Sequence, residues 1–235
     1  VALFVFSLSN IKQSRYWLAG IALAFSVAAK HSMIIGVPFI FLYLWSHNGI
    51  NKEFQRFVFY FLSSLIFIEV PFLLSESFRL MVINNREVEK IYWLFIEMNK
   101  ENLIFITPIV YSILLYSFWR IRKANFDLLM ASMGVAFSVV ILMTPAPSGW
   151  YLWLVPIFTL HQCRYGLGAI VLINIFSFLF VTYHLIYTSE ISPVLFEISL
   201  IRWDFIQTSF AQSIYYSTLV GCGVLVALQI LREGI

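Results

Sequence analysis

Charged residues are scarce in this chain. Lysine, arginine, aspartate and glutamate together make up 11% of its 235 residues, whereas a soluble domain carries about 25%. This scarcity excludes an ordinary soluble globule, and the net charge of +3 is too small and too dispersed to indicate a nucleic-acid partner. Only two cysteines occur. Cys163 lies near a predicted loop and Cys222 inside a predicted span, so we do not expect them to pair.

Several motifs that carry nucleotide, redox or metal chemistry are also missing. The sequence has no Walker loop, no GxGxxG, no CxxC and no His-rich metal motif. We therefore expect no nucleotide site, no resident cofactor and no metal centre in this chain. It also has no Asn-x-Ser/Thr glycosylation acceptor, so glycosylation gives no indication of the compartment.

Apolar residues dominate instead. They make up 61% of the chain, the mean hydropathy is +0.87, and 24 Phe, 12 Tyr and 7 Trp suit lipid-facing and interfacial surfaces. Because the bilayer interior offers backbone groups no water, they must be paired within helices. The sequence predicts an all-α, polytopic transmembrane bundle, with residues 1–235 as one domain. Val1 to Leu8 has the character of the last part of a span, so we expect this chain to be the C-terminal portion of a larger protein.

The distribution of charge predicts which loops face the cytoplasm. Beyond the first segments, the predicted spans are 57–74, 103–119, 127–143, 150–160, 167–187 and 214–231. The predicted inner segments hold Lys12, Arg15, Lys52, Arg56, Arg120, Arg122, Lys123, Arg164 and Arg232. The predicted outer segments hold fewer cations, namely Arg79, Arg86, Lys90, Lys100 and Arg202, so the positive-inside rule places the first group in the cytoplasm.

The first outer segment, residues 75–102, is the longest polar stretch. Its apolar residues recur at three- and four-residue steps: Val88, Ile91, Tyr92, Phe95 and Met98. This spacing predicts an amphipathic helix at the outer membrane surface. Arg79 in this segment has two interpretations. It could contact a phosphate, or it could be an ordinary solvated charge.

The segment from Trp17 to Trp45 is apolar except for Lys30 and His31 at its centre. As one helix it would be about 43 Å long, too long for a hydrocarbon core of about 30 Å. Cationic loops flank both sides of it, so we expect a broken, re-entrant hairpin with Lys30-His31 near its tip. Lys30 then either holds an anion at membrane depth or extends its ammonium to the interface. For His31 a polar packing role is favoured over metal ligation.

Two further features could carry chemistry. Glu69 lies near the outer end of its span, where it could act as a base, pair with Lys30, or form a purely structural ion pair. Trp150, Tyr151 and Trp153 follow a proline-rich turn. These rings could stack on sugars, or they could belong to an interfacial aromatic belt that needs no ligand.

Two stretches resemble a known superfamily. AGIALAFSVAAKHSMIIGVPFIFLYLW, residues 19–45, resembles the small-residue helix, lysine and proline hairpin of the C-type integral-membrane glycosyltransferases. TPAPSGWYLWLVPIF, residues 144–158, resembles their later aromatic turn and helix, especially in the mannosyltransferase-like members.

The resemblance implies hexose transfer, with mannose favoured, from a polyprenyl-phosphate donor to a glycan or lipid acceptor on the non-cytoplasmic face. Lys30 and His31 would hold the donor phosphate, and Trp150, Tyr151 and Trp153 would line the sugar cavity. Glu69 and Arg79 are possible secondary residues. The family's catalytic carboxylate lies in a first outer loop that would precede Val1, so the sequence leaves the catalytic residue unassigned.

Two other classes of protein remain open. A multi-pass transporter or flippase of a lipid-linked or anionic solute would also use a broken helix with a buried cation. A polysaccharide polymerase is the third alternative. For each of these functions we expect a multi-pass membrane protein, with a bacterial plasma membrane favoured over the endoplasmic reticulum. The expected partners of the glycosyltransferase are membrane lipid, the lipid-linked donor and the glycan or lipid acceptor.

Overall fold

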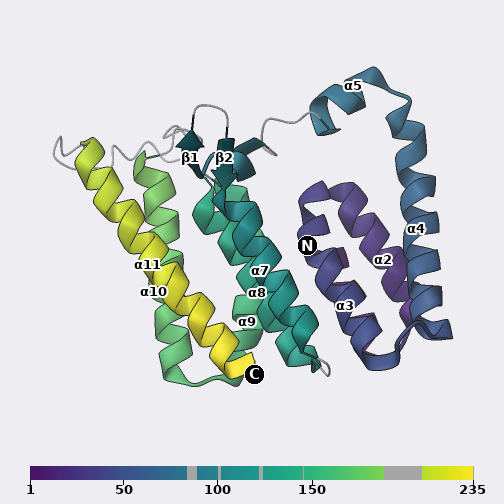
Figure 1. Ribbon diagram of the computed structural model, residues 1–235. Coiled ribbons are helices and arrows are strands. Elements are labelled where there is room, and N and C mark those ends of the chain that lie inside the picture. Colours follow the sequence, from purple (N-terminus) through teal and green to yellow (C-terminus); the bar gives the residue numbers. More distant parts are fainter. Residues whose placement is uncertain (84–88, 100–101, 122–123, 145, 188–207, 235) are drawn as a thin grey trace, which may run out of the picture. The chain divides into compact units, whose positions relative to one another are not determined.

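The computed structural model describes residues 1–83, 89–99, 102–121, 124–144, 146–187 and 208–234 (Figure 1). The chain forms two compact units, Val1–Thr144 (unit 1) and Pro145–Ile235 (unit 2). Helices account for most of the described residues, as the sequence predicted. Four of these helices are long and apolar enough to cross a membrane, which makes this an integral-membrane protein. They are α4 (Lys52–Leu73), α8 (Phe126–Met143), α10 (Leu167–Tyr187) and α11 (Ser209–Gly234).

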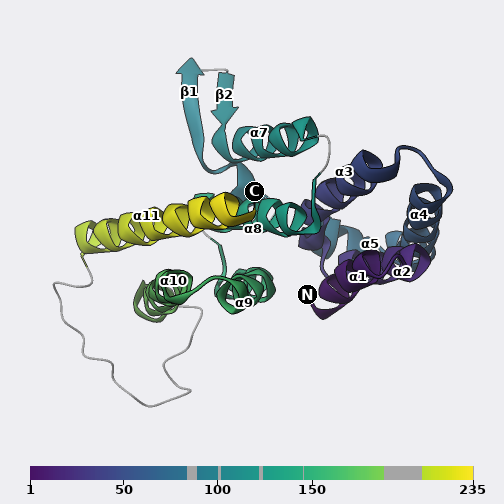
Figure 2. The same ribbon diagram turned by 90° about the horizontal axis from the view of Figure 1, so that it is seen from below.

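Unit 1 begins with two short helices, α1 (Ala2–Lys12) and α2 (Tyr16–Ala29), which lie side by side in Figure 2. The buried hydroxyl of Ser7 donates a hydrogen bond to the carbonyl of Ala19, 2.8 Å away. The other side of α2 packs on α4. A Cβ added to Gly20 would lie 2.6 Å from the carbonyl oxygen of Phe57. Gly20 therefore lets the two backbones approach closely, as small residues do between membrane helices.

The expected broken hairpin is present. After α2 comes η1, a 3₁₀ segment (His31–Gly36), and then α3 (Val37–Asn48). We call Lys30–Gly36 the hairpin tip. Neither α2 nor α3 reaches 18 residues, and at about 1.5 Å per residue each is too short to cross the membrane alone. Three rings from α3 and α4 help to fix the hairpin, because Phe41 makes edge contacts with Phe57 and Phe61.

The outer segment differs from the sequence prediction. The described residues form α5 (Glu76–Phe78), the π-helical η2 (Arg79–Ile83), the 3₁₀ helix η3 (Lys90–Tyr92), and two antiparallel strands. The strands are β1 (Phe95–Asn99) and β2 (Asn102–Phe105). The predicted amphipathic surface helix is therefore wrong in this part, and Val88 lies outside the described residues.

The physical reason is that two short strands pair with each other. Asn99 ends β1 and Asn102 begins β2, and asparagine favours a turn over a continuing helix. Phe95 is paired with Phe105, and each strand supplies the other's backbone partners. The ring of Tyr92 also packs against that of Phe105, with centroids 5.1 Å apart.

The last two helices of unit 1 are α7 (Ile106–Arg120) and α8. The side chain of Asn125 caps α8 by accepting a hydrogen bond from the amide of Leu128. Figure 1 shows α5 and the strands at one end of unit 1 and the α3–α4 turn at the other. We call the second the cationic end. The cations that begin or end the helices at this end are Lys12 of α1, Arg15 before α2, Lys52 and Arg56 of α4 and Arg120 of α7.

Unit 2 contains the 3₁₀ helix η4 (Ser148–Trp153), α9 (Val155–Arg164), α10 and α11. The bounds of α10 match the predicted span. Helix α11 packs on α10, with the ring of Tyr183 against those of Tyr215 and Tyr216. It begins at Ser209, earlier than the predicted Ile214. The charged residues expected in the preceding outer loop lie outside the described residues: Glu190, Glu197, Arg202 and Asp204.

Candidate functional site

The helix breaks at Lys30. Its backbone is extended, with φ −153° and ψ 101°. Helix α2 ends one residue earlier, and η1 begins one residue later. Pro38, in the first turn of α3, fits the start of that helix, because a proline has no N–H to donate and would clash with the carbonyl four residues earlier in a continuous helix. A Cβ added to Gly36 would lie 2.5 Å from the ring of Phe4, so the end of η1 packs closely against α1.

Helix α7 secures the hairpin tip. The hydroxyl of Tyr111 donates a hydrogen bond to the carbonyl of Ile35 across 2.8 Å. The tip is also polar inside an apolar bundle. The hydroxyls of Ser26 and Ser32 are buried without a hydrogen-bond partner among the described residues. These two serines flank Lys30 and His31 in the chain, so polar groups concentrate at the break.

His31 meets Glu69 at the tip. Its Nε2 lies 3.1 Å from Oε1 of Glu69, and the ring of Phe78 makes an edge contact with the imidazole, with centroids 6.2 Å apart. The side chain of Glu69 is 14% exposed, whereas that of His31 is 43% exposed. A mostly buried carboxylate thus fixes an imidazole that still reaches solvent. The structure joins Glu69 to His31, two residues that the sequence analysis had considered separately.

The two candidate cations are chain neighbours of residues in this contact. Lys30 precedes His31 and is exposed, and Arg79 follows Phe78 and is also exposed. The contacts of His31 with Glu69 and Phe78 therefore bring together the segments that carry Lys30, His31, Glu69 and Arg79. In the described part of the chain, no group of three or more His, Cys, Asp or Glu side chains is placed to hold a metal ion.

The three aromatic residues proposed to line a sugar cavity, Trp150, Tyr151 and Trp153, lie in unit 2. Trp150 stacks on Trp153 with ring centroids 4.7 Å apart, and Trp153 is buried. Tyr151 stacks on Phe180 of α10 at 5.0 Å, and its hydroxyl shares a short hydrogen bond with the hydroxyl of Ser177. Trp150 and Tyr151 are half-buried. These contacts anchor η4 on α10 and leave part of Trp150 and Tyr151 accessible.

A buried histidine that the sequence analysis did not consider fixes the turn before η4. The imidazole nitrogens of His184 lie 2.9 Å from the carbonyl of Phe180 and 3.0 Å from that of Ala146. His184 therefore ties the proline-rich turn to α10. The only signal in the sequence was a single histidine near the end of an apolar span.

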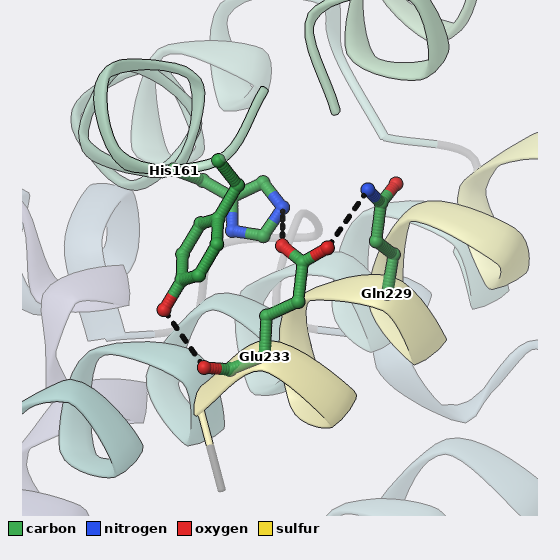
Figure 3. A network of polar contacts seen from close by, with 4 residues as sticks. His161, Gln229 and Glu233 are labelled. Carbon is green, nitrogen blue, oxygen red and sulfur yellow. Dashed lines mark hydrogen bonds and ion pairs between the residues drawn. The ribbon is translucent and has the colours of Figure 1, made fainter. Parts of the chain in front are cut away.

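A second polar cluster in unit 2 was also missed. Glu233 of α11 is contacted by three residues, as Figure 3 shows. They are His161 of α9, Tyr165 just after α9, and Gln229 of α11. In the sequence they are separated by up to 72 positions, and His161 and Glu233 were assigned to inner segments without a partner. The pattern offered no signal that could have paired them.

Comparison of the chain with protein-family models, with curated proteins and with solved structures gives no match. The chemistry of these residues and the two stretches that resemble the glycosyltransferases therefore remain as the indications of a function.

Proposed function

We propose that this chain is part of a membrane glycosyltransferase that moves a hexose, with mannose as the first candidate, from a polyprenyl-phosphate donor to an acceptor on the non-cytoplasmic face. The observation that supports the proposal is the helix break at Lys30. It leaves Lys30 exposed after the last residue of α2, the helix whose first residue follows Arg15 of the cationic end. By the positive-inside rule the cationic end is cytoplasmic, so the tip faces the other side.

The chemistry at the tip suits a phosphate leaving group. When the sugar departs, negative charge develops on the donor phosphate. A positioned ammonium stabilises that charge more strongly in a water-poor site than it would in bulk water. Lys30 supplies the ammonium and Arg79 a second cation on a neighbouring segment. His31 can donate a hydrogen bond to the same phosphate while Glu69 holds its ring in place.

The aromatic turn suits the sugar. Trp150 and Tyr151 are half-buried aromatic side chains, the kind of group on which a hexose packs, and Trp153 stacks on Trp150. None of these residues is a catalytic base, and we assign that role to no residue of this chain.

Sugar transfer by the full-length protein tests the proposal. The assay would follow a radiolabelled polyprenyl-phosphate hexose in detergent or nanodiscs. We expect Lys30→Ala to reduce the transfer rate by about 100-fold or more, as removal of an electrostatic stabiliser does elsewhere. The matched control is Lys52→Ala, which removes an exposed cation at the cationic end and should leave the rate unchanged. Full transfer by a folded Lys30→Ala protein would exclude Lys30 from the mechanism.

The broken helix also supports a second candidate, a transporter or flippase, because such proteins bind their solutes at interrupted helices. The same preparation can separate the two. In sealed vesicles, movement of the labelled donor between leaflets without sugar transfer would favour the flippase, and transfer without such movement would favour the transferase.

A further inference from the structure

His184 joins two segments of unit 2 through both nitrogens of its ring. Its Nδ1 lies 2.9 Å from the carbonyl oxygen of Phe180, one turn earlier in α10. Its Nε2 lies 3.0 Å from the carbonyl oxygen of Ala146, in the proline-rich turn that leads into η4. The side chain is 4% exposed. A buried ring therefore bridges α10 and the turn.

Both partners of this ring are hydrogen-bond acceptors. A backbone carbonyl oxygen can only accept, so each contact needs a hydrogen on the nitrogen that faces it. A neutral imidazole carries one N–H, and its second nitrogen would turn a bare lone pair toward a carbonyl oxygen. The imidazolium carries two N–H groups and can donate to both carbonyls. The geometry around His184 thus fits the charged ring and leaves one mismatch for the neutral ring.

Burial opposes a charge on this ring, and its surroundings offset that cost. The two carbonyl oxygens accept its hydrogens. His184 lies in the last turn of α10, where the helix dipole favours a cation. The ring of Phe180 lies against the imidazole, with centroids 4.3 Å apart and the planes 33° from parallel, and the face of an aromatic ring attracts a cation. Each of these features stabilises the imidazolium more than the neutral ring.

In the described part of the chain, tyrosines are the titratable residues grouped around His184. The ring of Tyr183 makes an edge contact with the imidazole, with centroids 5.5 Å apart. Tyr183 in turn contacts three further tyrosines of α10 and α11, namely Tyr187, Tyr215 and Tyr216. Tyr151 of η4 stacks on Phe180. Tyrosine is uncharged near neutral pH, so none of these groups changes charge when a histidine titrates. Glu190 and Glu197 lie outside the described residues.

We propose that His184 is a proton-binding clamp: the imidazolium holds the proline-rich turn on α10 through both carbonyls, and loss of the proton frees the turn from the helix. The contact with Phe180 lies within one helix and remains, so the contact with Ala146 is the one that opens. Because the clamped form offers acceptors to two N–H groups, acidification favours it and a rise in pH favours the released form.

Nitrogen NMR of the ring tests its protonation state. In the full protein, labelled with ¹⁵N-histidine and held in nanodiscs, both ring nitrogens of His184 should carry a hydrogen at about pH 5.5, and one should lose it by about pH 8.5, the range in which histidine titrates. The variant His184→Gln identifies the signal by its disappearance. One bare nitrogen at the lower pH would overturn the proposal, because the ring could then donate to only one carbonyl.

A distance measurement tests the position of the turn. Gly149 of η4 and Leu185 of α10 are exposed, so spin labels on Gly149→Cys and Leu185→Cys report the separation of turn and helix. Serine replaces the native Cys163 and Cys222. We expect one short distance at the lower pH. At the higher pH the ratio of clamped to released turn should be about tenfold smaller, because a hydrogen bond from a charged group is lost.

Two variants decide whether His184 is the responsible group. His184→Gln keeps a side-chain donor but does not titrate, so the distance should be the same at both pH values. His161→Gln removes the buried histidine of α9 and should leave the response intact. An unchanged distance in the parent protein, a full pH response in His184→Gln, or loss of the response in His161→Gln would overturn the proposal. Neither measurement follows sugar transfer, so the clamp is tested separately from the proposed function.

Discussion

The two units of this protein each contain a histidine–glutamate contact, and the two contacts differ mainly in their access to water. The nitrogen–oxygen distances are 3.1 Å for His31–Glu69 and 3.0 Å for His161–Glu233. In unit 1 the imidazole is 43% exposed and the carboxylate is the more enclosed partner, whereas in unit 2 the imidazole is 6% exposed. The same contact thus leaves the ring open to solvent in one unit and encloses it in the other.

The units also pack their helices differently. In unit 1, α2 and α4 meet backbone to backbone at Gly20. In unit 2, α10 and α11 meet through tyrosine rings, and a Cβ added to Gly221 of α11 would meet nothing within 4 Å in the described structure. Close backbone contact leaves no room for adjustment, whereas side chains can rotate. We expect unit 1 to be the less tolerant of added volume.

The largest expected effect tests this difference in packing. Gly20→Ala places a methyl group against the backbone of α4 and should lower the free energy of unfolding by about 3 kcal/mol, the upper part of the range for overpacking. Gly221→Ala should be neutral or stabilising, because alanine is the better helix former. Thermal unfolding of the two variants in the same nanodiscs would measure this. Equal stabilities would show that the α2–α4 contact can relax.

The second test compares the two carboxylates. Glu233→Ala removes the acceptor of Gln229 and the carboxylate that lies 3.0 Å from the buried ring of His161, and we expect a loss of about 2 kcal/mol in unfolding free energy. Glu69→Ala should cost less than about 1 kcal/mol, because the half-exposed ring of His31 can bond to water. Urea titration of both variants provides the measurement. A larger loss for Glu69→Ala would contradict the assignment of the enclosed pair to unit 2.

The smallest expected effect concerns the two tyrosine tethers. Tyr111→Phe removes the hydrogen bond to Ile35 in unit 1, and Tyr165→Phe removes the one to Glu233 in unit 2. We expect about 1 kcal/mol for the first and about 0.5 kcal/mol for the second, since a carbonyl in the last turn of α11 can find water more readily. Hydrogen exchange at the hairpin tip and at the end of α11 would localise each loss. Faster hydrogen exchange at the hairpin tip in Tyr165→Phe but not in Tyr111→Phe would contradict this expectation.

The helices followed from local features of the sequence. The apolar run of residues 167–187 has the bounds of α10, and the prediction for α8 differs by one residue at its start. The hairpin was predictable because its apolar run was too long for one span and carried Lys30 at its centre. The strands β1 and β2 were not predictable. The apolar residues of 88–98 fit a helical period, and residues 103–105, which form β2, had been assigned to the following span.

The candidate residues were predictable as individuals more than as groups. Lys30, His31 and Glu69 are polar residues in apolar surroundings and were identified for that reason. Their arrangement was not predictable, because His31 and Glu69 lie 38 positions apart and Glu69 could equally have met Lys30. The residues around Glu233 gave less signal still, since His161 and Glu233 lie beside loops where polar residues are ordinary.

The amino-acid sequence alone determined that this chain enters a membrane, where its apolar runs lie, and where the first long run must break. These properties follow from composition, hydrophobic length and local charge, which act over a few turns of helix. Only the tertiary structure decided which glutamate meets which histidine, that Gly20 faces the backbone of α4, and that His161 and Tyr165 contact Glu233. Such contacts need atoms from distant segments to approach within about 3 Å, and the periodicity of a single sequence does not specify this.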